Sequence, residues 1–162
     1  MKALVSFLCS LLALVGLTGC DPFVFDKIKP GITTDVEVRQ LLGEPGMEWR
    51  NEDGSVTWEY SGQPSGTQCH MITIGPDRIV RSVEQVLNEK HFARIKAGMT
   101  LDEVRRVLGK HANTQFFALS QERVYNWNVD GGPTITDPVY FTVHFDTAGH
   151  VTRTSLNVQY RR

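Results

Sequence analysis

The sequence predicts an α+β fold built from two tandem repeats, each a short helical pair followed by antiparallel β-strands and packed on one face of the sheet. The same helix-like motif occurs twice, and each time it is followed by aromatic and β-branched segments separated by Gly and Asp turns. Helices that precede strands rather than alternate with them are typical of α+β domains. The hydrophobic content of 41% and the charged content of 22% are those of a folded protein.

The first residues are expected to direct export and are excluded from the fold. Lys2 precedes an uncharged apolar stretch at residues 3–17, shorter than the roughly 20 residues that a membrane-spanning helix needs. Residues 17–20, Leu-Thr-Gly-Cys, resemble the lipobox of bacterial lipoproteins, whose cysteine is acylated and becomes the new N-terminus. This resemblance implies lipid attachment at Cys20. The alternative is an ordinary secretory signal in which Cys20 is a plain thiol.

The chain after the signal peptide at 1–19 is interpreted as one unit written twice, with repeats at 20–87 and 88–162. Residues 34–43 align with residues 100–109, and six of the ten positions are identical. Both segments begin Thr-x-x-Glu, which predicts a capping box at a helix start, and both end in a glycine that suits a left-handed C-cap. Helices this short are not stable alone, so each is expected to bury its apolar stripe on a sheet.

A shorter helix is expected before each capped helix. In the first repeat Asp21 is the expected N-cap, Pro22 occupies the first helical position and Phe25 lies on the apolar face. In the second repeat the helix is expected to start at Asn88, and Phe92 takes the place of Phe25.

Four strands are expected in each repeat. They are residues 47–50, 56–61, 68–74 and 78–87 in the first repeat, and residues 115–119, 124–129, 139–146 and 150–159 in the second. Trp58 and Tyr60 are expected to share the inward face, as are Tyr125 and Trp127 at corresponding places in the second repeat. A half of roughly 70 residues buries little surface alone, so the halves are expected to pack together or to form one continuous sheet.

The cysteines predict no internal disulfide. Cys9 leaves with the signal peptide and Cys20 is acylated, so Cys69 remains alone. Burial of Cys69 in a strand is expected, with pairing to another chain as the alternative. The neighbouring His70 should point to the opposite face of that strand and should not activate the thiol.

No catalytic or metal-binding residue is assigned, and the chain is expected to be no enzyme. The five histidines show no metal-ligand spacing, and no Gly-x-Ser-x-Gly, phosphate loop or Cys-x-x-Cys occurs. Glu37 and Glu103 are expected to be helix caps rather than an acid–base pair. A net charge of −1 disfavours nucleic acid. No small-molecule substrate is expected, and no cofactor apart from the acyl lipid on Cys20.

Aromatic side chains gather in the predicted strands, and most of them are expected in the core. They are Trp49, Trp58, Phe116, Phe117, Tyr125, Trp127 and Tyr140. Trp49, just before an Asp-Gly turn, is the residue expected to contact a partner. The loops at residues 62–66 and 130–137 are expected to make further contacts, because binding residues concentrate in loops.

The helical motif resembles the BamE (SmpA/OmlA) lipoprotein domain. Ile-Lys-x-Gly-Met-Thr-x-x-Glu-Val-x-x-x-Leu-Gly is present at residues 95–109 and, with one inserted residue, at residues 28–43. The resemblance implies a small α+β lipoprotein fold, in a family whose namesake is an accessory subunit of the complex that inserts β-barrel proteins into the outer membrane. The tandem plan is also similar to that of the β-lactamase inhibitor protein, which pairs two α+β repeats to present a concave sheet.

Two functions are therefore expected. The first is a non-enzymatic lipid-anchored envelope protein, an accessory in outer-membrane β-barrel protein assembly or envelope integrity, whose partners are envelope proteins such as the β-barrel assembly complex. The alternative is a periplasmic protein-binding or inhibitor module that resembles the tandem-repeat β-lactamase inhibitor protein. The anchor is expected in the outer membrane, facing the periplasm. The inner membrane is the alternative, because Asp21 directly after Cys20 resembles the retention signal of enteric bacteria.

Overall fold

The fold consists of two antiparallel four-stranded sheets with helices against them, in a computed structural model that describes residues 23–130 and 137–158. In chain order the elements are the 3₁₀ helix η1 (Phe25–Lys27), α2 (Asp35–Leu42), β1 (Met47–Arg50), β2 (Val56–Ser61), β3 (Cys69–Ile74), β4 (Val80–Gln85), α3 (Glu89–Phe92), α4 (Leu101–Leu108), β5 (Asn113–Phe117), β6 (Glu122–Asp130), β7 (Val139–Phe145) and β8 (Val151–Val158). The sheets have the orders β1-β2-β3-β4 and β5-β6-β7-β8. The predicted α+β class is confirmed, and the tandem arrangement agrees with it.

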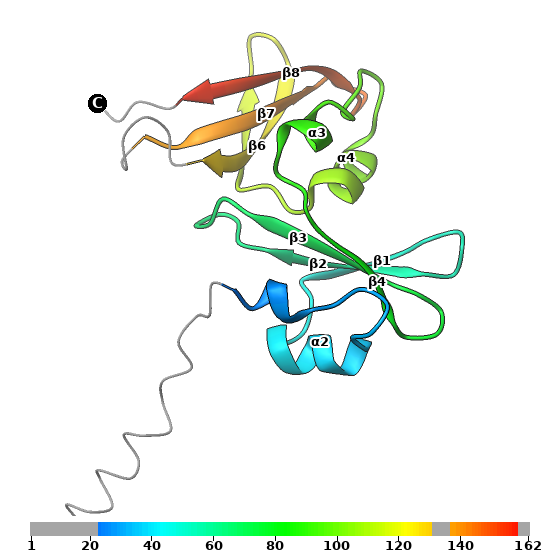
Figure 1. Cartoon of the computed structure of the whole chain (residues 1–162). Coiled ribbons are helices and arrows are strands. Elements are labelled where there is room, and N and C mark those ends of the chain that lie inside the picture. The colour runs from blue at the N-terminus through cyan, green and yellow to red at the C-terminus, as the bar shows by residue number, and fades with distance from the viewer. Residues whose placement is uncertain (1–22, 131–136, 159–162) are drawn as a thin grey trace, which may run out of the picture.

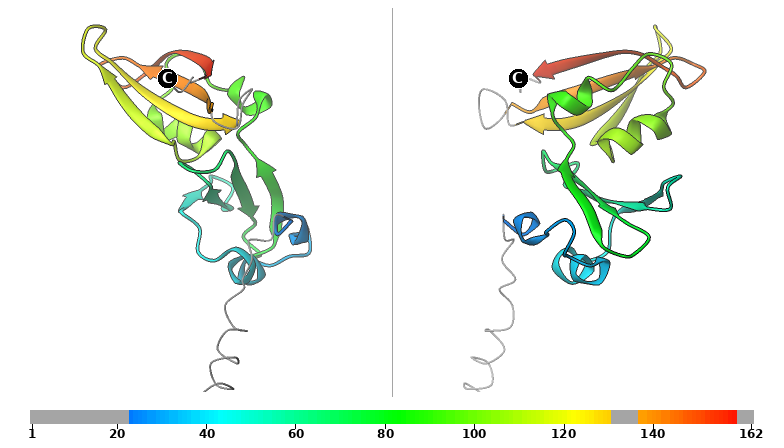
Figure 2. Two further views of the ribbon diagram at one scale, coloured as in Figure 1. Left: turned by 90° about the vertical axis from the view of Figure 1, so that its left-hand side faces the viewer. Right: turned by 45° about the vertical axis from the view of Figure 1, so that its right-hand side comes forward.

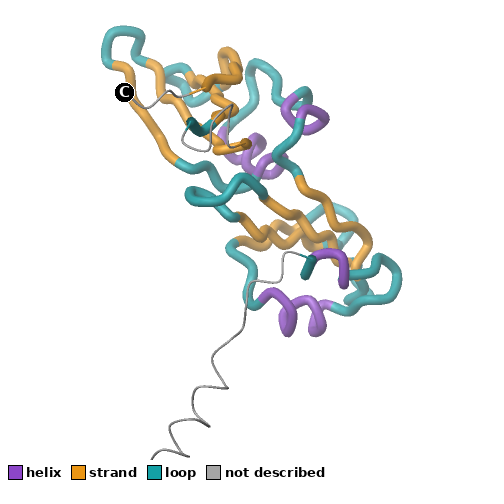
Figure 3. The backbone as a smooth tube through the Cα atoms, turned by 60° about the vertical axis from the view of Figure 1, so that its left-hand side comes forward, coloured by secondary structure: helices purple, strands orange, loops and turns teal. Residues whose placement is uncertain are grey.

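The sheets and helices are stacked in layers. Figure 1 shows α2 beneath the first sheet and α4 between the first and second sheets, and the turned views of Figure 2 agree. The backbone trace in Figure 3 shows the same sequence of helix, sheet, helix and sheet along the long direction of the molecule. Of the two expected arrangements, packed halves are confirmed and one continuous sheet is wrong.

Both capped helices begin as predicted. The Thr34 and Thr100 hydroxyls each accept a hydrogen bond from the backbone N–H of the glutamate three residues later. The side chain of that glutamate in turn accepts a hydrogen bond from the backbone N–H of the threonine. The helices end at Gly43 (φ 79°, ψ −163°) and Gly109 (φ 73°, ψ −160°). Their φ is positive as expected, but the extended ψ is not that of a left-handed cap. It belongs to a region that is essentially restricted to glycine.

The shorter leading helices differ between the repeats. In the second repeat α3 begins after Asn88, whose side chain accepts from the His91 N–H, as predicted. In the first repeat the expected helix is reduced to the three-residue 3₁₀ turn η1, which follows Val24 and has no side-chain cap. The predicted cap at residues 21–22 lies outside the described residues.

Inward-facing aromatic residues occupy matching positions in the two repeats. The Tyr60 hydroxyl donates to the Gly43 carbonyl at 2.9 Å, and the Trp127 indole N–H donates to the Gly109 carbonyl at 3.0 Å. In each repeat the aromatic side chain on the second strand therefore binds the C-terminal end of the capped helix. The expected inward direction of both residues is confirmed.

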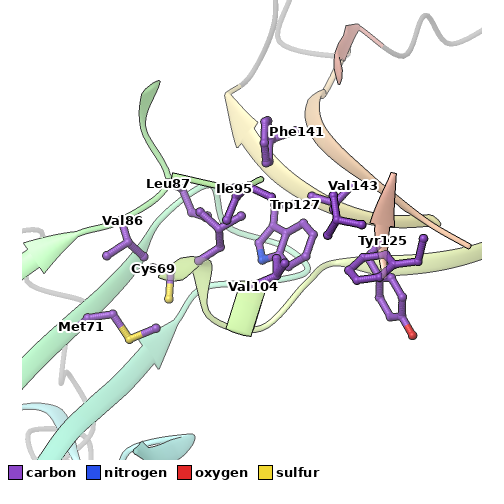
Figure 4. Packing of buried hydrophobic residues seen from close by; sticks show 13 residues of the cluster. Cys69, Met71, Val86, Leu87, Ile95, Val104, Tyr125, Trp127, Phe141 and Val143 are labelled. Atoms are coloured by element: carbon purple, nitrogen blue, oxygen red, sulfur yellow. The ribbon is translucent and has the colours of Figure 1, made fainter. Parts of the chain in front are cut away.

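The two repeats share one hydrophobic core. A single cluster of buried side chains contains Cys69 and Met71 from β3 together with Val104 from α4 and Trp127 from β6 (Figure 4). A second cluster lies between α2 and the opposite face of the first sheet, and includes Val38. The first sheet is thus covered on both faces, by its own helix and by the helix of the second repeat.

A buried carboxylate holds the second repeat against the first sheet. Glu59 on β2 is 2% exposed, and its Oε1 accepts from the Lys110 N–H at 2.9 Å, just after α4 ends. Its Oε2 accepts from the Trp49 indole N–H at 3.4 Å and lies 3.9 Å from the Arg105 guanidinium. Because the carboxylate has partners from both repeats, it fixes the position of α4 on the sheet.

A side-chain amide makes a second link between the repeats. The Gln63 side chain donates from Nε2 to the Asn128 carbonyl at 2.6 Å and accepts at Oε1 from the Asn128 N–H at 3.1 Å. This is the hydrogen-bond pattern that a neighbouring strand would offer to β6. The loop at residues 62–66, expected to contact something, therefore contacts the second repeat of its own chain.

Candidate binding surface

The most exposed apolar feature of the described residues is the tip of the β5–β6 hairpin. Phe116 is 57% exposed, Phe117 is 47% exposed and Leu119 is fully exposed. The strands remain paired up to Phe117 and Glu122, so a regular ladder supports the tip. The Gln121 side chain donates to the Ala118 carbonyl at 2.6 Å and closes the turn. The tip is thus an ordered element that displays three large apolar side chains to solvent.

A pocket of about 360 Å³ lies beside the tip. Four large apolar or aromatic side chains line it, together with polar residues: Leu101, Phe116, Tyr125 and Phe145, and Gln121, Arg123, Asp146, Thr147 and Gly149. Phe116 therefore borders a cavity as well as solvent. Apolar side chains with a few polar groups are the usual lining of a binding pocket.

The tip lies far from the N-terminal end of the described chain. In the left view of Figure 2 the β5–β6 hairpin projects at one end of the molecule, while η1 and α2 lie at the other. The two sheets and α4 separate these ends. An anchor that precedes residue 23 would leave the hairpin tip as a remote end of the molecule.

The outer face of the second sheet carries a network of polar side chains. Asn126 donates to Asn113 Oδ1 at 2.7 Å and accepts from the Thr142 hydroxyl at 2.9 Å, which in turn accepts from Asn157 at 3.3 Å. These side chains satisfy one another across four strands. A hollow of about 160 Å³ lies on this face, beside Tyr140.

The corresponding face of the first sheet is covered. There α4 packs on Cys69 and Met71, and no equivalent helix packs on the second sheet among the described residues. The repeats therefore stack in one direction, and the outer face of the second sheet ends the stack.

Trp49, the expected partner contact, is only 9% exposed and lies between the repeats. The guanidinium groups of Arg105 and Arg106 lie 5.5 Å and 4.9 Å from the centre of its ring. The Trp49 ring therefore packs against the second repeat of its own chain. This packing accounts for the burial of an aromatic side chain that stands just before a turn. A contact with a partner stays a prediction, limited to the small exposed part of the ring.

Several expected sites fall on residues that the structure does not describe. Cys20 lies outside the described residues, so its acylation stays a prediction. The loop at residues 130–137 is described only at its ends.

Cys69 and His70 are separated as predicted. Cys69 is fully buried against α4, and burial raises the pKa of its thiol to about 12, with a further contribution from the Glu59 carboxylate. His70 points to the other face, where its ring stacks on Phe25 at 3.6 Å. Desolvation lowers the pKa of His70. The thiol is therefore protonated near neutral pH, and the His70 ring does not face it.

The predicted helix caps account for the carboxylates that the sequence singled out. Hydrogen bonds from Thr34 and Thr100 lower the pKa values of Glu37 and Glu103, respectively. In the described parts of the chain, no group of three or more His, Cys, Asp or Glu side chains could hold a metal ion. Nor does any helix in those parts have the length and apolarity to cross a membrane.

The hairpin tip was not predicted from the sequence. Most strand aromatics were expected in the core, and Trp58 and Trp127 are buried there, but Phe116 and Phe117 are exposed. A signal was available: Phe116 and Phe117 are adjacent, and adjacent strand residues point to opposite faces, so both cannot enter the core. Leu119, in the turn after them, extends the same apolar run.

Comparison with known proteins gives structural likenesses and no family. No model of a known protein family matches the chain, and no curated protein sequence matches it. A DUF4309 family protein (YjgB) from Bacillus subtilis is 12% identical with a TM-score of 0.32, over 85% of this chain and 91% of that one. A proposed beta-lactamase inhibitor protein from Streptococcus mutans is 14% identical with a TM-score of 0.32, over 82% of this chain and 92% of that one.

These findings correct the resemblance to the BamE family. No family model matches the chain, so nothing beyond the motif supports that resemblance. The physical reason lies in the motif at residues 95–109 and 28–43, which consists of cap, core and turn residues that any short capped helix packed on a sheet requires. The expected role in β-barrel protein assembly came from that resemblance alone and is withdrawn with it.

Proposed function

We propose that this chain is a non-enzymatic binding module of the bacterial envelope that recognises another protein through the tip of its β5–β6 hairpin. The observation that carries the proposal is the exposure of Phe116, Phe117 and Leu119 on a regular hairpin. Aromatic side chains that lose their contact with water on binding contribute most of the affinity of many protein interfaces. The pocket beside Phe116 offers a place for one side chain of the partner.

The scaffold supports a binding role in a second way. The first sheet is covered on both faces, and a buried carboxylate and a side-chain amide link the repeats. A rigid support reduces the conformational entropy that is lost on binding. The second repeat, which carries the hairpin, is therefore held in one position against the first.

For the location we propose a lipid anchor at Cys20, facing the periplasm, in the outer membrane, with the inner membrane as the alternative because of Asp21. An anchor at that end would direct the remote hairpin tip away from the anchoring membrane. The partner would then be a periplasmic protein or the periplasmic part of an envelope protein.

The first test is purification of the full chain from gently solubilised membranes, with mass spectrometry of what accompanies it. The unsubstituted chain should retain a partner, and the double variant Phe116→Ser/Phe117→Ser should lose it. Ile32→Ser is the matched control, because Ile32 is 75% exposed at the opposite end of the molecule. Retention of every partner by the double variant would contradict the proposal.

The inhibitor form of the proposal makes a narrower claim. If the partner is a periplasmic hydrolase, titration against a panel that includes β-lactamases should find one enzyme that is bound with nanomolar affinity, about −12 kcal/mol. The double variant should then lose inhibition and binding together. A flat titration against the panel would remove the inhibitor form and leave the partner to be found by purification.

A further inference from the structure

The outer edge of the second sheet is unusually open. Among the described edge strands, β8 has eight residues, against four in β1, six in β4 and five in β5. Among backbone hydrogen bonds between described residues, only the first residue of β8 is bonded on the outer side: the Val151 carbonyl accepts from the Gly98 N–H, and the Val151 N–H donates to the Met99 carbonyl, both at 2.8 Å. The rest of β8 forms ladder pairs with β7 alone within the described residues. A long strand edge of this kind is a template for pairing with another strand.

The side chains of β8 do not protect this edge. Natural edge strands are usually blocked by lysine, proline or inward-pointing charges. Arg153 is the single charged residue of β8, and it is bonded to Glu122 at 3.1 Å. The segment from Thr154 to Val158 carries no charge and no proline.

Two apolar side chains of β8 also remain uncovered. Leu156 is 62% exposed and Val158 is 37% exposed, and they lie opposite Phe141 and Val139, both buried. They therefore continue the apolar, helix-covered side of the sheet beyond its last strand. One more strand beside β8 would cover them.

We propose that this strand is β8 of a second copy of the chain, paired antiparallel about a two-fold axis near Ser155. Such pairing is isologous, so β8 must complement itself. An axis at Ser155 places Thr154 opposite Leu156 of the second copy on the apolar side, and Arg153 opposite Asn157 on the polar side. No like charges meet, and two exposed leucines become covered. The product is a continuous eight-stranded sheet.

Cysteine cross-linking in membranes tests this pairing with the full chain. Directly opposed residues of antiparallel strands have Cα atoms about 4.5–5.5 Å apart, within the range that a disulfide spans. Ser155→Cys should therefore give a covalent dimer under mild oxidation. Leu119→Cys, at a more exposed site on the hairpin tip, is the matched control and should give little. The unsubstituted chain reports the background, since its Cys69 is buried.

A second substitution separates pairing from chance collision. Adding Leu156→Lys to Ser155→Cys places a charge beside the axis and should reduce the cross-linked fraction at least tenfold. Sedimentation of the detergent-solubilised, unsubstituted chain should show a dimer that Leu156→Lys converts to a monomer. Equal cross-linking at positions 155 and 119, cross-linking that ignores Leu156→Lys, or a monomer at all concentrations would each overturn the proposal.

Discussion

Single residues determine how closely the two repeats approach each other, and Gly109 is the clearest case. A Cβ at this position would overlap Cys69 Sγ and would lie 3.3 Å from both Glu59 Cδ and Met71 Cε. The equivalent Gly43 has nearly the same backbone conformation, but nothing lies within 4 Å of a Cβ there. A comparison of alanine substitutions at these two glycines therefore separates the energetic cost of backbone strain from that of overpacking between the repeats.

We expect Gly109→Ala to destabilise the protein more than Gly43→Ala. Both variants should lose about 1–3 kcal/mol because alanine is strained in this backbone region. Gly109→Ala should lose a further 1–3 kcal/mol or so, because the methyl group overpacks the interface. Urea denaturation of the two variants measures the difference. Equal losses would show that α4 does not press on the first sheet as described.

Because of Cys69, the free energy of unfolding should depend on pH in the alkaline range. Burial raises the pKa of its thiol from 9.0 to about 12, so the unfolded chain ionises first as the pH rises. The contribution of the thiol to the free energy of unfolding is constant below pH 9. Between pH 9 and 12 this group should lower the free energy of unfolding by about 1.4 kcal/mol per pH unit. Tyr60, whose pKa burial raises from 10.0 to about 12, adds a fall above pH 10.

Denaturation at pH 8 and pH 10 measures this fall, with Cys69→Ala as the control. The variant should be less stable at both values because of the cavity, yet it should lose less between them. A fall that is the same in both proteins would contradict the assignment to Cys69.

For single residues, the sequence predicted the features that depend on residue type and on close neighbours in the chain. The capping threonines and the burial of Cys69 follow from spacing and from residue type, and both are observed. The surroundings of Trp49 and Glu59 were not predictable, because their partners Arg105 and Lys110 come from the other repeat, more than 40 residues away. Nothing in a local pattern states which distant side chain will cover an aromatic ring.

At the scale of elements, the two capped helices have the same design in different surroundings. α2 has a sheet on one side, whereas α4 lies between two sheets. We expect Thr34→Ala and Thr100→Ala each to lower the free energy of unfolding by about 1 kcal/mol, because each removes the hydroxyl that accepts a hydrogen bond from the backbone N–H of the glutamate three residues later. Thr34→Ser and Thr100→Ser keep that hydroxyl and should restore most of the loss. Thermal denaturation of the four variants measures this, and an uncorrected loss in the serine variants would argue against capping.

The strands were predicted well where turn residues define them. Met47–Arg50 and Val56–Ser61 have the expected bounds, because an Asp-Gly turn separates them. β5 begins two residues earlier than expected, and the exposure of the aromatic side chains at its hairpin tip was not predicted. The error has a physical cause: alternation predicts a strand but not whether another layer covers the face it predicts.

At the scale of the whole molecule, the tandem repeats form a stack with two unlike ends. One end carries α2 and the start of the described chain, and the other carries the outer face of the second sheet and the projecting hairpin. The sequence predicted two similar halves that pack together. It could not predict their order in the stack, because the back face of the first sheet is recognised as an interface only once α4 is seen against Cys69.

Photo-cross-linking in living cells tests whether the hairpin tip contacts another protein. A photoreactive phenylalanine analogue is placed at Phe117, or, as the control, at the exposed Ile32 in the loop between η1 and α2. The account predicts one defined protein adduct from position 117 and none of that mass from position 32. The same adduct from both positions, or no adduct from position 117 in cells that express the chain at its native level, would contradict it.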